Sequence, residues 1–436
     1  MSAVVKTISG RVRRVLRHEL VHNAFSLYAI QGLNYLMPLI LLPYLLRKLG
    51  PHSYGSIVLA QSLMGYAMTV TDFGFNFTSA RDISVARADS NAVSRIFWTV
   101  IAAKMLLLAI SAVVIAAIVI CTPMFRHEWP TFLACGIAVV GNSAFPQWYL
   151  QGLERLKDAA LIQASSKVAV MLATFIFVNS PADGWIAATI SSSPQLIGIA
   201  IAAVLRKPLW PEHFYRPTRE QIMASLKGSW HMFASSVATT LYGNTNALAL
   251  GLICGDSAVA VYNLALRLVL AVQGAAAPLT QAIFPRASLL FARDHAKAQQ
   301  LMVRVVWTLL PLVGAISLLL AIFAPEVVRI VGGRSYDDAA LLVRIMAITP
   351  VLIAAGGLPA QIVIVSLNLT RQMSRIYLGV GLMNVALLPP LVLYWQARGA
   401  AISLTVAEAA AVTLLVIVAW RGSRLSGMRA AQVGAG

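Results

Sequence analysis

The chain has 436 residues, of which 59% are apolar and only 11% are charged, and its mean hydropathy is +0.76. Soluble domains carry about 25% charged residues, so this composition excludes a soluble globular protein and indicates a polytopic membrane protein. The net charge of +18 does not indicate nucleic-acid binding, because the basic residues lie in short loops between apolar runs.

Apolar runs long enough to cross a bilayer predict about twelve transmembrane helices, since a span needs roughly 20 apolar residues. The runs are 24–46, 54–79, 96–120, 131–151, 159–178, 184–205, 229–253, 258–285, 300–324, 338–367, 373–395 and 400–420. A count of eleven or thirteen would require one run to be merged or split, and 338–367 is the first candidate. We therefore expect an all-α polytopic membrane protein.

The distribution of Lys and Arg predicts the orientation of the chain. Of the 34 basic residues, 23 fall in loops on the side of the N-terminus, six fall on the opposite side, and five fall inside predicted spans. Because cytoplasmic loops are enriched in Lys and Arg, both termini are expected in the cytoplasm. The longest basic loop divides the chain into two six-helix bundles, a common transporter plan. The expected parts are a basic N-terminus at 1–22, bundles at 23–205 and 228–420, an inter-bundle loop at 206–227 and a tail at 421–436.

Motifs of catalysis and metal binding are absent from the sequence. There is no HExxH, no CxxC pair, no GxxxxGK[ST] and no GxSxG. A membrane-embedded polymerase would need acidic or histidine residues in a sizeable outer loop, and the longest predicted outer loop, 325–338, is short. We therefore expect no enzyme, no metal and no cofactor.

Ionisable residues inside predicted spans are candidates for a functional site, because a charge at mid-helix costs about 2.5–3.5 kcal/mol on insertion scales. Lys104, Lys167 and Arg267 lie deep in their spans, whereas Arg304 and Arg344 lie near helix ends, where snorkelling explains them. Snorkelling is also the alternative for the three deep residues. A cationic cavity would favour an anionic cargo such as a phosphate or pyrophosphate group.

Two embedded acids, Asp72 and Glu408, are candidates to pair with a cation or to bind a coupling ion. For Asp72 the alternative is a helix-interrupting turn at Asp72-Phe73-Gly74. Embedded amides are candidates for the lining of a polar cavity, although in lipid such groups more often join one helix to another. They are Asn34, Asn142, Asn244 and Asn246. Kinks are predicted at Pro38, Pro43, Pro146, Pro278, Pro350, Pro359 and Gly356-Gly357.

Two stretches resemble a known family. PYLLRKLG at 43–50, with the later Tyr54-Gly55, Phe73-Gly74 and Arg81, is similar to the N-terminal pattern of Wzx-type polysaccharide flippases. PQWYLQGLER at 146–155 looks like their fourth-span signature, P-x-W-x-x-Q-G-L-E. With Lys167 and the predicted spans, the resemblance covers nearly the whole chain, although the second half is generic. These flippases form a branch of the multidrug/oligosaccharidyl-lipid/polysaccharide exporter superfamily.

The resemblance implies a V-shaped pair of six-helix bundles in the bacterial inner membrane. It implies transport of an undecaprenyl-pyrophosphate-linked oligosaccharide to the periplasmic leaflet for O-antigen, capsule or exopolysaccharide synthesis. Cavity cations would bind the pyrophosphate, and our candidates are Arg81, Lys104, Lys167 and Arg267. An ion gradient would drive the cycle through Asp72 or Glu408, although the first span lacks the acid that some relatives have. Implied partners are membrane lipid, a polysaccharide polymerase and a chain-length regulator, and not nucleic acid.

Three alternatives follow from the same features. A multidrug exporter of the same superfamily shares the fold, but its usually cationic cargo would favour an acidic cavity, which the excess of embedded base argues against. A membrane-embedded polymerase would need the missing catalytic loop. The peptidoglycan lipid flippase usually has two further spans, for which this chain is too short.

Overall fold

The computed structural model describes residues 37, 40–206, 208–367 and 369–433. This part of the chain is helical and contains no strand. Six of its helices are long and apolar enough to cross a membrane, or up to seven if the bent pair Pro181–Ser192 and Pro194–Val204 forms one span. The prediction of an all-α multi-pass membrane protein is confirmed, while the count of twelve spans and the location of the termini stay predictions. The basic N-terminus 1–22 lies outside the described residues.

The first bundle contains helical residues 40–72 and the elements up to α9. The predicted turn at Gly50-Pro51 is present, because Gly50 has a φ of +73° and interrupts the helical stretch there. Pro146 separates α5 from α6, as the sequence predicted. The elements are α2 (Phe75–Ala86), α3 (Ser90–Cys121), α4 (Pro123–His127), α5 (Trp129–Ala144), α6 (Gln147–Gly152), α7 (Leu156–Phe177), η1 (Pro181–Asp183), α8 (Gly184–Ser192) and α9 (Pro194–Val204).

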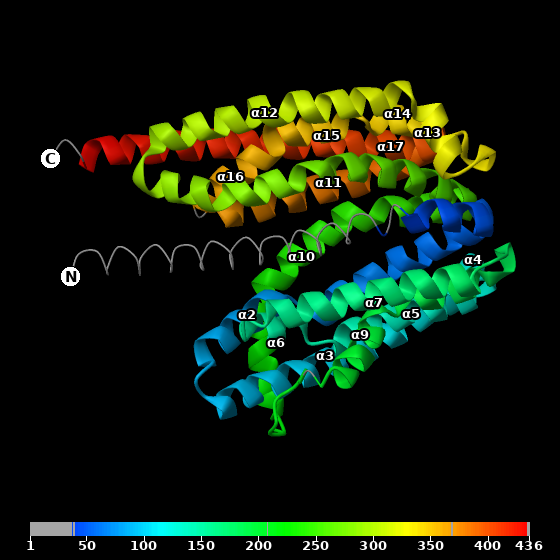
Figure 1. Cartoon of the computed structure of the whole chain (residues 1–436), viewed down its shortest axis with the longest axis horizontal. Coiled ribbons are helices and arrows are strands. Elements are labelled where there is room, and N and C mark those ends of the chain that lie inside the picture. Colours follow the sequence, from blue (N-terminus) through cyan, green and yellow to red (C-terminus); the bar gives the residue numbers. More distant parts are fainter. Residues whose placement is uncertain (1–36, 38–39, 207, 368, 434–436) are drawn as a thin grey trace, which may run out of the picture.

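The second bundle contains the elements from α11 onward, and α10 runs obliquely between the two bundles (Figure 1). The predicted kink at Gly356-Gly357 is a π-helix, and α17 is broken at Gln396, whose φ is +50°, between the predicted spans 373–395 and 400–420. The elements are α10 (Arg219–Cys254), α11 (Asp256–Arg293), α12 (His295–Ile322), α13 (Ala324–Val331), η2 (Arg334–Tyr336), α14 (Ala339–Met346), α15 (Ile348–Leu352), η3 (Ile353–Gly357), α16 (Leu358–Ser366) and α17 (Thr370–Val433).

The N-terminus of α10 differs from the sequence prediction. The whole of 206–227 was expected as a loop, but the helix begins at Arg219. A capping box explains the early start: the Gln221 backbone N–H donates to Thr218 Oγ1 at 3.3 Å, and the Thr218 backbone N–H donates to Gln221 Oε1 at 2.9 Å. The prediction missed this pair because it followed hydropathy alone.

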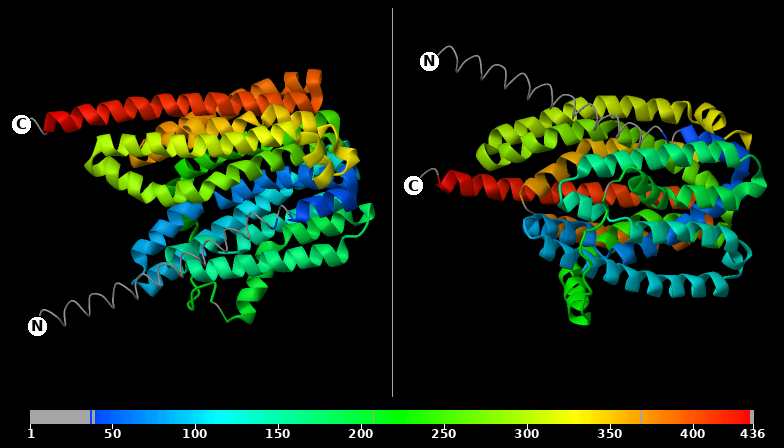
Figure 2. Two further views of the ribbon diagram at one scale, coloured as in Figure 1. Left: turned by 45° about the horizontal axis from the view of Figure 1, so that its top comes forward. Right: turned by 60° about the horizontal axis from the view of Figure 1, so that its bottom comes forward.

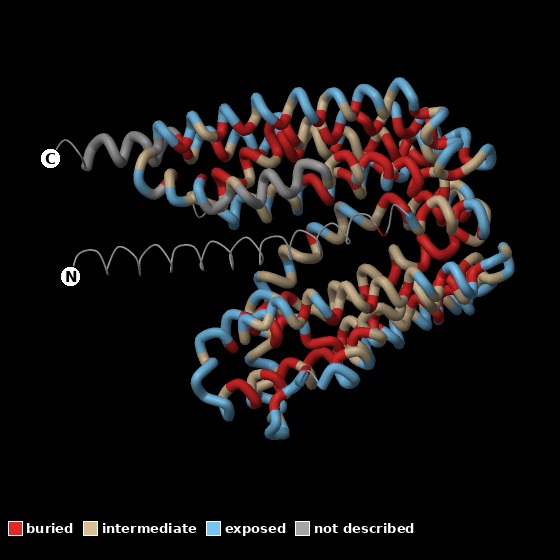
Figure 3. Tube along the Cα trace, viewed as in Figure 1, coloured by how far each residue is buried: buried red, intermediate tan, exposed pale blue. Residues whose placement is uncertain are grey.

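The two bundles form a V. They meet at the right end of Figure 1 and diverge toward the left end, and the views in Figure 2 show the same two groups. Buried residues concentrate within each bundle and where the bundles meet (Figure 3). The connections α2–α3, α6–α7, α11–α12 and α16–α17 lie at the divergent end, which is therefore the end of the predicted basic loops.

Glycines bring the helix at 51–72 into close contact with α10 and the start of α11. A Cβ on Gly55 would lie 1.9 Å from the Asp256 carbonyl oxygen, and one on Gly251 would lie 2.5 Å from the Leu59 side chain. Small residues permit such backbone approach between membrane helices, where dispersion contacts replace the hydrophobic effect as the driving force. This contact is the closed end of the V.

Hydroxyl pairs continue the same contact toward the divergent end. Tyr66 and Thr245, Thr69 and Thr240, and Thr78 and Ser229 each place their oxygens 2.7 Å apart. Each pair joins the first bundle to α10. The predicted tendency of embedded polar groups to bond helix to helix is thus realised along this interface.

We expect Gly55→Ala to destabilise the junction, because the added Cβ would overlap the Asp256 backbone and overpacking typically costs about 1–3 kcal/mol. Thermal unfolding of the purified protein in detergent measures the effect. Gly136→Ala is the matched control, since Gly136 lies within α5 and nothing lies within 4 Å of a Cβ placed there. Equal melting temperatures for the two variants would contradict the close approach.

Candidate functional site

Two of the predicted site residues form a salt bridge inside the first bundle. Lys104 on α3 is 1% exposed, and its Nζ donates to Asp72 Oδ1 at 2.9 Å and to the Asn142 carbonyl oxygen at 3.2 Å. Asp72 is 26% exposed. The sequence placed both charges in the membrane, and their pairing shows how the fold accommodates them. Lys104 is accordingly buried against its partner and does not present a free charge to a substrate in this conformation.

Both interpretations of Asp72 hold at once, because it pairs with a cation and also precedes a helix break. Phe73 has a φ of +43° and Gly74 a φ of +79°, after which α2 begins at Phe75. The Phe73 ring stacks on Phe233 of α10, with centroids 4.2 Å apart. The break redirects the chain so that Asp72 reaches Lys104 while Phe73 contacts the oblique helix.

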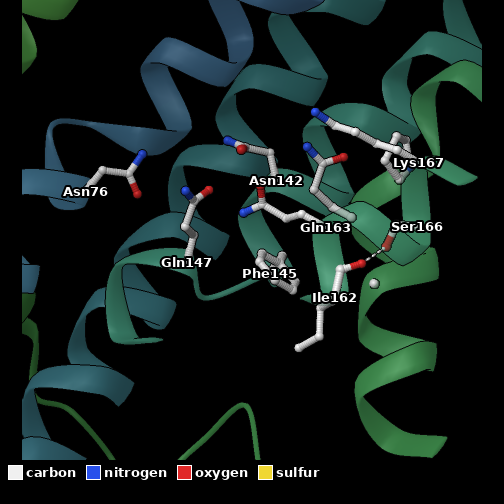
Figure 4. Close-up of a pocket in the computed structure, with 11 residues that line it drawn as sticks. Asn76, Asn142, Phe145, Gln147, Ile162, Gln163, Ser166 and Lys167 are labelled. Atoms are coloured by element: carbon white, nitrogen blue, oxygen red, sulfur yellow. Dashed lines mark hydrogen bonds between the residues drawn. The ribbon is translucent and has the colours of Figure 1, made fainter. Parts of the chain in front are cut away.

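A polar pocket of about 170 Å³ lies between α2, α5, α6, α7 and α9 (Figure 4). The amides of Asn76, Asn142, Gln147 and Gln163 face the same space, and the Lys167 amine extends toward it. The remaining lining residues are Phe145, Ile162, Ser166, Pro194, Gln195 and Gly198. Five carboxamides and one amine thus line a small hollow within an apolar bundle.

Asn142 connects this pocket to the salt bridge. Its backbone carbonyl accepts from Lys104, while its side chain lines the pocket and its buried Nδ2 has no hydrogen-bond partner among the described residues. An unsatisfied buried donor costs about 1–3 kcal/mol, so a ligand acceptor here would gain the bond that the protein leaves unmade. Lys167 is half-buried at the same pocket.

The chemistry of the lining suits a polar ligand that carries hydroxyl groups and a negative charge. Each carboxamide offers two donors and an acceptor, which complements hydroxyls, and an ammonium offers donors to an anion. Two larger hollows, of about 610 and 730 Å³, are lined mainly by apolar side chains. We therefore take the polar pocket as the candidate site, because its polar groups converge.

The other predicted cations lie elsewhere. Arg267 on α11 is exposed and has no ion-pair partner within the described residues; it lies one helical turn after Asn263, which accepts a hydrogen bond from Tyr54 of the other bundle. It therefore lies beside the junction of the two bundles. Arg81 is exposed and bonds Asp82 at 3.0 Å, near the divergent end of α2. The four predicted cations thus do not form one cluster.

The remaining predicted residues are dispersed. Glu408 on α17 is half-buried in the second bundle. Asn244 on α10 abuts Gly65 at the inter-bundle contact, where a Cβ on Gly65 would lie 2.3 Å from its Nδ2. Asn34 lies outside the described residues. Of the predicted residues that the structure describes, only Asn142 and Lys167 line the polar pocket.

The expectation that Asn246 lines a cavity requires correction. It is 1% exposed, donates to the Tyr262 hydroxyl at 3.1 Å and accepts from Asn384 Nδ2 at 2.7 Å. Ser403 in turn donates to Asn384 Oδ1 at 2.7 Å. These four buried groups satisfy one another and join α10, α11 and both parts of α17, so Asn246 is a packing residue.

Gln163 and Gln195 are pocket residues that the sequence analysis missed. Gln163 precedes Lys167 by one helical turn on α7, so both side chains lie on the same face. This spacing was readable in the sequence. Gln195 had no comparable signal, because only the bend between α8 and α9 brings it to the pocket.

Comparison with known proteins identifies the family. The model of the family described as "Polysaccharide biosynthesis protein" matches residues 20–291, which is more than half of the chain. The chain belongs to the polysaccharide biosynthesis protein family. The resemblance seen in the sequence is thereby confirmed.

Two curated relatives of the chain are both named "Putative O-antigen transporter". The one from Escherichia coli (strain K12) is 32% identical over 92% of this chain and 97% of the relative. The one from Shigella dysenteriae is 28% identical over 90% of this chain and 98% of the relative.

Solved structures share the fold of the chain at low identity. An inward-facing multidrug resistance MATE family transporter of the MOP superfamily matches with a TM-score of 0.67 and 16% identity, covering 91% of this chain and 96% of that one. Lipid II flippase MurJ in an inward closed conformation matches with a TM-score of 0.66 and 13% identity, covering 93% and 90%.

We expect Lys104→Met to destabilise the protein strongly, because it leaves the Asp72 carboxylate unpaired. Breaking a buried pair costs about 3–5 kcal/mol, and the loss should be at the lower end because Asp72 is partly exposed. The double variant Asp72→Asn with Lys104→Met should recover most of the loss in thermal unfolding. Additive losses in the two single variants would contradict the pairing.

Proposed function

We propose that the chain is a flippase that moves an undecaprenyl-pyrophosphate-linked oligosaccharide across the bacterial inner membrane for surface polysaccharide synthesis. Family membership and the names of the two relatives support transport of a polysaccharide precursor. The observation that carries the proposal is the polar pocket with its lysine inside a membrane bundle, because an apolar anchor has no need of such a lining.

The geometry suggests how the molecule works. The basic loops lie at the divergent end of the V, so this end faces the proposed cytoplasmic side. A lipid-linked sugar would enter from that side, while the polyprenyl tail stays in the bilayer. The pocket carboxamides would bind sugar hydroxyls and Lys167 would bind the pyrophosphate, while the exposed Arg267, which lies apart from the pocket, would bind the pyrophosphate at another point of its path.

The alternative functions are less well supported. A cationic drug would need an acid at its site, yet the pocket lining contains a lysine and no Asp or Glu. A polymerase is disfavoured because the curated relatives are named as transporters. A polysaccharide polymerase and a chain-length regulator remain our predicted partners, and an ion gradient remains the predicted driving force.

We expect Lys167→Ala and Arg267→Ala each to lower surface polysaccharide about tenfold or more. Losing a charge-assisted hydrogen bond typically costs about 1.5–3 kcal/mol, and 1.4 kcal/mol corresponds to a factor of ten. Complementation of a strain that lacks the gene, with immunoblots of surface polysaccharide and of the membrane-inserted protein, measures the effect.

Lys227→Ala on the exposed start of α10 is the matched control and should export normally. Normal export by both Lys167→Ala and Arg267→Ala, at normal protein levels, would overturn the proposed role of these cations.

A further inference from the structure

Three ionisable side chains meet at the closed end of the V. His52 lies between Glu128, which precedes α5, and Asp256, the first residue of α11. Its Nε2 is 3.5 Å from Glu128 Oε1, and its Nδ1 is 3.3 Å from Asp256 Oδ2. Glu128 belongs to the same bundle as His52, whereas Asp256 belongs to the other. The imidazole therefore bridges the two bundles, and we call these three residues the outer triad.

Both ring nitrogens of His52 face carboxylate oxygens. A neutral imidazole has one N–H and one lone pair, so it can donate to only one of the two carboxylates and would direct its lone pair at the other. The arrangement is satisfied only when the outer triad holds an additional proton, either on the imidazole, so that both nitrogens donate, or on a carboxyl group. This conclusion holds for either tautomer of the neutral ring.

The surroundings make this proton important. The Asp256 side chain is 6% exposed, and its buried Oδ1 has no hydrogen-bond partner among the described residues. Glu128 Oε2 accepts from Ser56 Oγ at 3.2 Å. His52 is the ion-pair partner that the described structure provides for both acids, and it is 67% exposed, so aqueous protons reach it.

Other charged groups at this end contact other partners or form no ion pair within the described residues. Arg47 donates to the Ile330 carbonyl, and the Lys48 ammonium lies 5.9 Å from the centroid of the Tyr44 ring. Asp183 accepts from the backbone N–H groups of Asn179 and Ser180.

Arg329 bonds Asp337 at 3.0 Å and holds the pKa of that carboxyl below its usual value, so the pair stays charged near neutrality. On α4, Arg126 and His127 are exposed and form no ion pair within the described residues.

We propose that His52, Glu128 and Asp256 form a proton-binding site that holds the outer ends of the two bundles together. With the proton bound, the imidazolium compensates a carboxylate on each bundle. Without it, one carboxylate faces a lone pair and the two acids repel, so the junction loosens. Histidine is suited to this role because it ordinarily titrates between about pH 5 and 8.

The proton site favours the closed junction, but other contacts also hold the junction closed. Tyr54 donates to Asn263 Oδ1 across the junction at 2.9 Å, and Gly55 packs on the Asp256 backbone, and neither contact depends on the proton. The next step rests on the proposed function and orientation. A proton that binds from the periplasm would favour closure of the outer side. That closure returns an empty carrier to the conformation open to the cytoplasm, and it depends on the pH of the outer solution, because His52 stays exposed at that end when the junction is closed.

Distance measurements on the purified full-length protein in lipid nanodiscs test the proposal. Spin labels on Ala182→Cys and Ser335→Cys report the two outer ends, because both positions are exposed and lie on different bundles. The native cysteines at 121, 135 and 254 are first replaced. We expect the short-distance population to grow from pH 8.0 to pH 5.5, by at most about tenfold per pH unit, the limit for one linked proton.

Three variants sharpen the test. His52→Gln should abolish the pH dependence, and Asp256→Asn should keep the short distance at both pH values because it removes the charge that needs compensation. His127→Gln, an exposed histidine next to Glu128, is the matched control and should respond like the parent.

A parent distribution that does not change with pH, or an unchanged response in His52→Gln, would overturn the proton site. The measurement uses no lipid-linked sugar. An intact pH response in a protein that exports no polysaccharide would therefore overturn the proposed function alone.

Discussion

The close packing of the helix at 51–72 on α10 and α11 is the contact on which the arrangement of the molecule depends. Gly55 and Gly251 let the backbones approach, and hydroxyl pairs extend the contact along α10. Because α10 runs obliquely between the bundles, and the contact with the start of α11 lies at one end, the bundles can diverge at the other. A contact of small and polar groups is also weak per residue in lipid, at about 0.6 kcal/mol for a hydrogen bond, so it suits an interface that must reopen.

The two lysines inside the first bundle, Lys104 and Lys167, have different surroundings. Lys104 neutralises Asp72 next to the helix break, and so holds α3 against the first helices of its bundle. Lys167 lines the neighbouring pocket together with five carboxamides. The large net charge of the chain therefore says little about its interior, where one lysine has a structural role and another borders the pocket.

Hydropathy and helix-breaking residues predicted most of the helices, because apolar length and proline or glycine positions are local properties. The breaks at Gly50, Pro146 and Gly356-Gly357 fall where the sequence placed them. The site was less predictable, because it depends on which faces meet. Depth along a span selected Lys104 and Lys167 equally, but only packing shows that the first is paired with Asp72. Asn246 and Asn142 were indistinguishable in sequence, yet one is sealed in a network and the other borders a pocket.

The sealed network of Asn246, Tyr262, Asn384 and Ser403 has a consequence for biogenesis. Asn246 and Asn384 are 138 residues apart, so the amide on α10 enters the bilayer long before its partner on α17 is synthesised. Until then the second bundle contains an incompletely satisfied polar group in hydrocarbon, a state that favours provisional contacts with lipid headgroups, water or the insertion machinery. Assembly of this bundle is therefore completed by its last helices, and a truncated chain lacking α17 would expose a polar seam that quality-control proteases can detect.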